Sequence, residues 1–128
     1  MTLSKQVLYA FLGILFWFSG AMMVKVFGES VFTENNLYLI LFYILCFPLA
    51  YLFLIIIKKV GNIKNNEVFR PVVIATFTAM FCDGIALAWF RFIYSSNYEI
   101  ALHGAASILW GGAAGLFIGH ILTNKNSQ

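Results

Sequence analysis

The sequence predicts an all-α integral membrane protein, a bundle of four transmembrane helices in a single membrane domain that covers residues 1–128. Apolar residues make up 62% of the chain and charged residues only 10%. A soluble domain carries about 25% charged residues, so this chain has too little polar surface for a water-facing shell. The apolar residues also form four runs, each long enough to cross a bilayer as a helix. Lipid is therefore the expected surrounding of most of the chain.

The first apolar run, Val7–Val24, predicts a helix over residues 7–27. As an α-helix the run is about 27 Å long, which is close to the hydrocarbon thickness of a bilayer. Lys5 before the run and the small residues Ser19–Ala21 also fit a cleaved signal peptide. Because the run is longer than a usual signal core and contains Trp17, we interpret it as an uncleaved span.

The second predicted helix covers residues 37–57 and contains no charged residue. Pro48 lies near its middle and frees a backbone carbonyl four residues earlier, so we expect a kink there. The connection after this helix is the most basic part of the chain. Its topology-setting residues are Lys58, Lys59, Lys64 and Arg70.

The distribution of basic residues predicts the orientation of the chain. With four spans, six basic residues fall on one side of the membrane and two on the other. The six are Lys5, Lys58, Lys59, Lys64, Arg70 and Lys125, and the two are Lys25 and Arg91. Because basic residues concentrate on the cytoplasmic side, we expect the N-terminus, the C-terminus and the middle connection to be cytoplasmic.

The third predicted helix covers residues 71–93 and contains Asp83, the one acidic residue deep inside an apolar run. Asp83 lies about 18 Å from the cytoplasmic end of the helix, slightly beyond the membrane midplane. An ionisable residue at this depth is a functional-site candidate. Arg91 lies about 12 Å further along a straight helix, so it is not expected to pair with Asp83 directly.

The expected neighbours of Asp83 are the polar or aromatic residues at similar depth on the other helices. They are Ser19 and Trp17, Tyr43 and Cys46, and Ser107. A carboxyl group in hydrocarbon favours a neutral or hydrogen-bonded state, and no basic residue lies at this depth. Two interpretations stay open. Asp83, Ser19, Tyr43 and Ser107 form a proton or substrate site, or Asp83 forms a buried hydrogen bond that only joins helices.

The fourth predicted helix, residues 100–122, is rich in small residues. The small-residue stripe, with one member at every fourth position, consists of Ser107, Gly111, Gly115 and Gly119. Small residues at this spacing let another helix approach closely, so we interpret the stripe as a helix-packing face. Its expected partner is either the first helix of the same chain or the fourth helix of a second copy.

Several classes of site have no support in the sequence. His103 and His120 lie about 25 Å apart along one helix, so a single metal or haem could not take both, and we expect no cofactor. Cys46 and Cys82 lack metal-ligand spacing. The chain has no basic face for nucleic acid and no nucleophile with a general base in helical reach. We therefore expect neither a nucleic-acid partner nor an enzyme.

Four short features of the sequence carry a resemblance to a known family. Leu12–Trp17, Pro48 and Met80–Gly84 together with Leu109–Trp110 resemble a family of small bacterial four-span membrane proteins of unknown function. The resemblance implies a multi-pass location in the bacterial cell membrane, the inner membrane, and no known activity. In layout the chain is also similar to small multidrug-resistance transporters, which form dimers. Their defining glutamate lies in the first helix, where this chain has no acidic residue, so the resemblance is architectural and does not extend to their mechanism.

Two functional hypotheses follow. The first is proton- or ion-linked transport of a small solute by an oligomer, with Asp83 as the exchanging group. The second is a non-catalytic membrane scaffold or subunit that associates through the small-residue stripe with itself or with a larger membrane partner.

Overall fold

The structure is a computed structural model that describes residues 2–127, with the side chains of residues 2–124. As predicted, the fold is all-α, and four helices are long and apolar enough to cross a membrane. The long helices and the two short 3₁₀ helices are α1 (Leu3–Val31), α2 (Leu37–Gly61), η1 (Asn65–Glu67), α3 (Phe69–Trp89), η2 (Arg91–Ile93) and α4 (Tyr98–Ser127). The orientation of the chain in a membrane stays a prediction from its basic residues.

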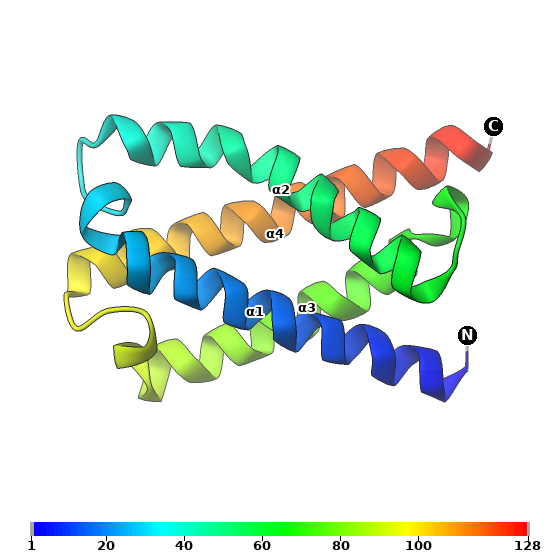
Figure 1. Cartoon of the computed structure of the whole chain (residues 1–128), viewed down its shortest axis with the longest axis horizontal. Coiled ribbons are helices and arrows are strands. Elements are labelled where there is room, and N and C mark those ends of the chain that lie inside the picture. The colour runs from blue at the N-terminus through cyan, green and yellow to red at the C-terminus, as the bar shows by residue number, and fades with distance from the viewer. Residues whose placement is uncertain (1, 128) are drawn as a thin grey trace.

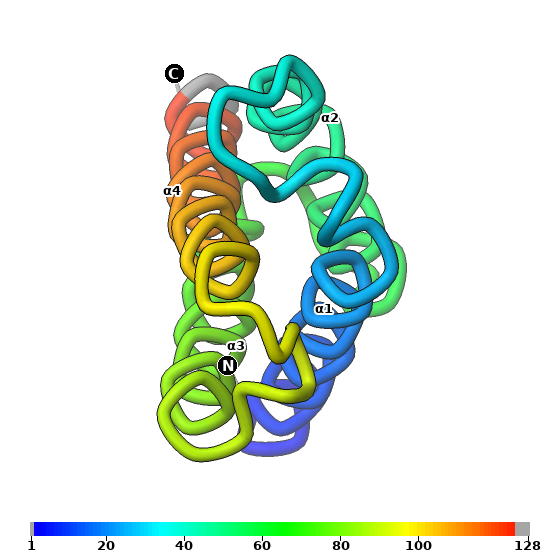
Figure 2. Tube along the Cα trace, turned by 90° about the vertical axis from the view of Figure 1, so that its left-hand side faces the viewer, coloured from blue at the N-terminus to red at the C-terminus, as the bar shows by residue number. Residues whose placement is uncertain are grey.

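The four helices run lengthwise through the bundle, and consecutive helices run in opposite directions (Figure 1). Helix α1 packs mainly against α3, α3 against α4, and α4 against α2, while α2 and α3 barely meet. The end-on view in Figure 2 shows α1 and α2 on one side and α3 and α4 on the other. Both chain ends lie beside the connection from α2 to α3, which we call the basic end. The opposite end is called the Tyr94 end.

Side chains stabilise the starts of three helices. Thr2 Oγ1 accepts a hydrogen bond from the Lys5 amide at 3.3 Å, and Asn36 Oδ1 accepts one from the Tyr38 amide at 2.9 Å. Asn97 Oδ1 accepts a hydrogen bond from the backbone amide of Glu99 at 2.9 Å. These contacts satisfy amide groups that a helix leaves unpaired at its start.

The observed helix ends differ from the predicted ends in two informative places. Helix α2 continues through Pro48 to Gly61, where Asn62 adopts a left-handed conformation with φ 51°. Helix α3 was predicted to reach residue 93 but ends at Trp89, because Phe90 leaves the helical conformation with φ −129° and ψ 41°. The chain then turns through η2, and this turn carries Tyr94 back into the bundle, where its side chain is 0% exposed.

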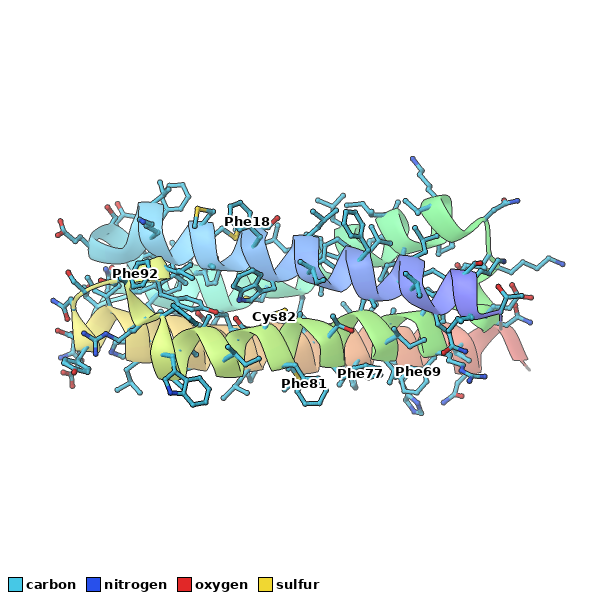
Figure 3. All side chains as sticks on the ribbon, turned by 90° about the horizontal axis from the view of Figure 1, so that it is seen from below. Phe18, Phe69, Phe77, Phe81, Cys82 and Phe92 are labelled. Atoms are coloured by element: carbon cyan, nitrogen blue, oxygen red, sulfur yellow. The ribbon has the colours of Figure 1, made fainter. Side chains whose placement is uncertain are left out.

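Two clusters of apolar side chains fill the ends of the bundle. The first, at the basic end, includes Tyr9, Leu12, Leu54, Ile57, Val68 and Val72. The second, at the Tyr94 end, includes Ala21, Val24, Phe32, Ala86, Tyr94 and Ile100. Outside the bundle, large apolar side chains such as Phe18, Phe77 and Phe81 are exposed and point away from α1 and α3 (Figure 3). Such a surface suits lipid as its solvent.

Candidate functional site

A cavity of about 170 Å³ lies inside the bundle and is lined by residues from all four helices. Its walls are mostly apolar and aromatic, with Phe16 from α1 and Phe53 from α2 among them. Among the described residues that line it, Asp83 carries the one formally charged side chain, and there is no Lys, Arg or His. The cavity is therefore an apolar chamber with a single carboxyl group in its wall.

Beyond Ser107 and Ile108, α4 lines the cavity with glycines. Gly111, Gly112 and Gly115 of α4 line the cavity, and Gly20 of α1 lines it as well. A Cβ atom placed at Gly115 or Gly20 would meet no other atom within 4 Å. Space at these positions is therefore open, and a larger side chain there would occupy the cavity.

The small-residue stripe faces the interior of its own chain. Ser107, Gly115 and Gly119 are buried. A Cβ atom at Gly111 would lie 4.0 Å from Cys46 Sγ of α2, and one at Gly119 would lie 3.5 Å from Phe69 of α3. Within the chain, the stripe therefore faces α2, α3 and the cavity rather than α1, which was one of its two expected partners, because the bundle places α1 against α3.

The closest approach of α4 to α1 occurs off the stripe. At Gly104 a Cβ atom would lie only 2.7 Å from Cγ1 of Val24 on α1. Near the Tyr94 end, a Cβ atom at Gly28 of α1 would lie 2.7 Å from Cγ2 of Ile100 on α4. These glycines permit close helix packing at the Tyr94 end, whereas Gly115 of the stripe leaves open space further along α4.

Asp83 is joined to the Tyr94 end by a chain of hydrogen bonds. The Asp83 side chain is 8% exposed, and its Oδ1 accepts a hydrogen bond from the hydroxyl of Tyr94. The same hydroxyl accepts a hydrogen bond from Nε1 of Trp17 at 2.9 Å. This Trp17–Tyr94–Asp83 chain connects α1 to α3 through a residue of the connection that follows η2.

The phenol of Tyr94 remains a donor over the physiological pH range. Its burial, followed by its hydrogen bond to Asp83, raises the pKa of Tyr94 above that of a free tyrosine. The proton therefore stays on the phenol oxygen, which donates to Oδ1 of Asp83. The hydrogen bonds of the described residues leave the other carboxyl oxygen, Oδ2, without a partner, while Asp83 itself lines the cavity.

The structure places the predicted neighbours of Asp83 at several sites. Ser19 is exposed, and its hydroxyl donates to the Leu15 carbonyl oxygen of its own helix at 3.0 Å. The ring of Tyr43 stacks on Trp110, with the ring centres 5.5 Å apart, and the Tyr43 carbonyl oxygen accepts from Trp110 Nε1 at 3.0 Å. Neither Ser19 nor Tyr43 lines the cavity. Equal depth did not bring these two side chains to Asp83, because they lie at other positions around their helices.

Three of the predicted neighbours do share the cavity with Asp83. Ser107, Trp17 and Cys46 all line it. The hydroxyl of Ser107 donates to the Gly104 carbonyl oxygen of its own helix at 2.9 Å and makes no hydrogen bond to Asp83. Trp17 reaches Asp83 only through Tyr94.

Sequence reasoning missed Tyr94, because it extended the third helix to residue 93. On a continuous helix, eleven residues would place Tyr94 about 16 Å beyond Asp83. The turn through η2 removes this separation. A polar segment with Arg91 and Ser95 marks the end of the apolar run, but nothing in it indicates that the chain folds back.

The ionisable groups outside the cavity have other neighbours. Arg91 donates from Nη2 to the Ser96 carbonyl oxygen at 3.2 Å, and its guanidinium carbon lies 3.5 Å from the ring centre of Tyr98. Arg91 therefore lies at the Tyr94 end and is not paired with Asp83. In the part of the chain that the structure describes, no three His, Cys, Asp or Glu side chains come together in a way that could hold a metal ion.

Comparison with known proteins gives a family but no activity. No curated protein and no solved structure matches the chain. The model of one family of unknown function, DUF5367, matches residues 31–126. This segment includes Asp83, Tyr94 and the small-residue stripe, while Trp17 precedes it. Because the match covers most of the chain, the protein belongs to the DUF5367 family of unknown function.

Proposed function

We propose that this protein transports a small solute across the membrane and that Asp83 exchanges a proton or another cation for the solute. One observation carries the proposal. The one carboxyl group among the described residues that line a mostly apolar cavity is buried, and one of its oxygens has no hydrogen-bond partner among those residues. A carboxyl group maintained at such a position inside a membrane helix is costly, which favours a functional role.

The chemistry of the exchange requires only the carboxyl group. Asp83 is neutral when protonated and negative when it has lost the proton, and the negative form needs a cation or donors to compensate it. The titratable groups around it are Tyr94, Cys82 on the same helix and Cys46 across the cavity. None of these groups carries a positive charge in either protonation state. The negative charge of Asp83 would therefore be removed by a bound proton or balanced by a bound cation.

A purely structural role explains fewer of the observations. If Asp83 served only to join α1 and α3, its bond to Tyr94 would account for one carboxyl oxygen. It would not account for the second oxygen, or for glycines on α4 that leave the space beside it open. The stripe that was expected to support a scaffold is directed into the same chain, which leaves less of it available for docking.

Reconstitution into liposomes that contain a pH-sensitive dye tests the proposal. Three small solutes of similar shape serve as probes, namely tetramethylammonium, trimethylamine N-oxide and methanesulfonate, which are cationic, neutral and anionic. With the wild-type protein, we expect one of them to enter while protons leave. Asp83→Asn should abolish this coupled movement. Absence of flux above empty liposomes for all three, or equal flux with Asp83→Asn, would refute the proposal.

Two leucine variants provide matched controls for the cavity. Gly115→Leu places a side chain in the cavity, so we expect it to block flux. Gly84→Leu adds the same side chain on α3 next to Asp83, but Gly84 is exposed and a Cβ atom there meets nothing within 4 Å. Flux should survive in the Gly84→Leu protein. If both variants behave alike, the cavity is not the solute path.

A further inference from the structure

The geometry points to the class of solute. We infer that the cavity binds a small organic monocation whose apolar body is about as large as a benzene ring, with its charged group at Oδ2 of Asp83. This inference rests on the proposed function, because it identifies the solute of that same cavity. Charge, volume and wall chemistry each support it.

The charge on the cavity wall indicates that the ligand is a cation. Asp83 is the one formally charged group among the described residues that line the cavity, and its charge when ionised is negative. An anion would meet this charge without any Lys, Arg or His to balance it. A neutral solute would leave an ionised Asp83 uncompensated in apolar surroundings, which is costly. A monocation compensates the carboxylate and leaves no excess charge.

Hydrogen bonding selects the atom that receives the ligand. Tyr94 donates to Oδ1 and is in turn held by Trp17, so one side of the carboxyl group is occupied by the protein itself. Oδ2 has no partner among the described residues and remains available to a donor in the cavity. An ammonium group donates well to a carboxylate oxygen, because both partners are charged. Tyr94 is therefore a positioning residue that fixes the orientation of Asp83.

Volume selects the size of the ligand. The cavity measures about 170 Å³. An apolar cavity of about 150 Å³ in another protein stays dry and binds benzene, so this cavity has room for a single ring with a short charged arm. This volume favours a single ring over a solute with two fused rings and side groups. Small aliphatic cations of similar volume belong to the same class.

The aromatic side chains of the cavity wall favour a ligand with an apolar body. Phe16 and Phe53 line the cavity and stack on each other with ring centres 4.5 Å apart. Trp17 lines it as well, and its indole belongs to the same hydrogen-bonded chain as Asp83. Aromatic rings attract organic cations as well as apolar groups, most strongly where water is excluded. The cavity offers a strongly hydrated metal cation only the carboxyl group of Asp83, and such a cation needs more oxygen ligands than this.

Calorimetric titration of the purified protein in detergent tests the inference with three ligands of nearly equal shape. Benzylammonium is the cation, benzyl alcohol the neutral analogue and benzoate the anion, and each is also titrated into empty micelles as a blank. The wild-type protein should bind benzylammonium at least tenfold more tightly than benzyl alcohol and should not bind benzoate. With Asp83→Asn the preference for the cation over the alcohol should disappear. Benzylammonium binding to the wild-type protein should also release protons, which is read from its dependence on the ionisation heat of the buffer.

Several outcomes would overturn the inference. They are a preference for benzoate or benzyl alcohol, a cation preference that survives in Asp83→Asn, or no binding of any of the three ligands to the wild-type protein. The comparison of ligands on the wild-type chain decides the matter even if Asp83→Asn fails to fold. Gly115→Leu should lose the binding of benzylammonium, and the control Gly84→Leu should retain it.

The inference and the proposed function fail in different ways. Coupled flux of methanesulfonate or trimethylamine N-oxide that depends on Asp83 would keep transport and overturn the cationic solute. Tight, Asp83-dependent binding of benzylammonium together with no flux of any probe would keep the cation site and overturn transport.

Discussion

Removal of the hydroxyl oxygen of Tyr94 tests whether the hydrogen-bonded chain holds α1 and α3 together at the Tyr94 end. The variant Tyr94→Phe retains the ring, which is fully buried among the apolar side chains of this end. It removes the donor to Asp83 and the acceptor for Trp17 Nε1 at once. The substitution therefore changes hydrogen bonding while it leaves almost all of the packing in place.

The expected cost follows from these two hydrogen bonds. Hydrogen bonds between side chains in membrane proteins contribute about 0.6 kcal/mol on average and at most about 1.7 kcal/mol each. Two such bonds give a loss of about 1 to 3 kcal/mol in the free energy of unfolding. Because Oδ1 of Asp83 and Nε1 of Trp17 are both left without their partner inside the bundle, we expect a value in the upper half of this range.

Reversible unfolding in mixed micelles of a mild detergent and sodium dodecyl sulfate measures this loss. The matched control is Tyr98→Phe, which removes the same hydroxyl group from a side chain that is 75% exposed. The ring of Tyr98 keeps its contact with the guanidinium group of Arg91 in this variant. If Tyr94→Phe costs no more than the control, within about 0.5 kcal/mol, the chain of hydrogen bonds does not stabilise the fold as argued.

Three further predictions concern helix packing, orientation and alkaline stability. Gly13→Ala should lower the free energy of unfolding by about 1 to 3 kcal/mol, because its Cβ atom would clash with the backbone carbonyl oxygen of Ala75 on α3. Gly84→Ala, at an open position, should cost nothing, and equal losses would contradict this packing. Cysteine introduced at Asn62 should react with a membrane-impermeant maleimide only from the cytoplasm and cysteine at Asn97 only from outside, and the reverse pattern would invert the proposed orientation. Because the pKa of Tyr94 is raised on folding above its ordinary value of 10.0, its contribution to stability is fully present below that pH and falls above it. The difference in unfolding free energy between wild type and Tyr94→Phe should therefore shrink as the pH rises above 10.0, and growth of the difference would show the opposite shift.

The sequence predicted the helices well, because a membrane-spanning helix depends mainly on the length of an apolar run along the chain. A run of apolar residues about as long as a bilayer is thick needs little more than its own length to be identified as a span. The position of Asp83 along its helix follows from the same count. The ends of the helices were less predictable, since Phe90 is as apolar as the residues before it and leaves the helix only in its backbone conformation.

The site was less predictable because it depends on rotation about the helix axes and on a chain reversal. Ser19 and Trp17 lie only two residues apart and at nearly equal depth, yet Trp17 lines the cavity and Ser19 is exposed. Depth in the membrane therefore does not predict which of the two side chains lines the cavity. Tyr94 reaches Asp83 through a turn that follows the helix, and the spacing of apolar residues does not predict such a turn.

The small-residue stripe shows a different limit of sequence reasoning. Small residues at every fourth position remove side-chain volume from one face of a helix, and this has two physical outcomes. A neighbouring helix packs close and fills the space, as α3 does with Phe69 at Gly119, or the space stays open, as at Gly115. Which outcome occurs depends on the positions of the other helices, which the stripe itself does not encode.

The most direct test of the central claim is a count of protons against solute in one reconstituted system. Radiolabelled tetramethylammonium uptake and proton release are measured together in the same liposomes, with the wild-type protein and with Asp83→Asn. Because a single carboxyl group holds either a proton or the charge of the solute, we expect about one proton to leave for each cation that enters, and no coupled movement in the variant. Cation uptake without proton release, or an unchanged ratio in Asp83→Asn, would contradict the assignment of Asp83 as the exchanging group.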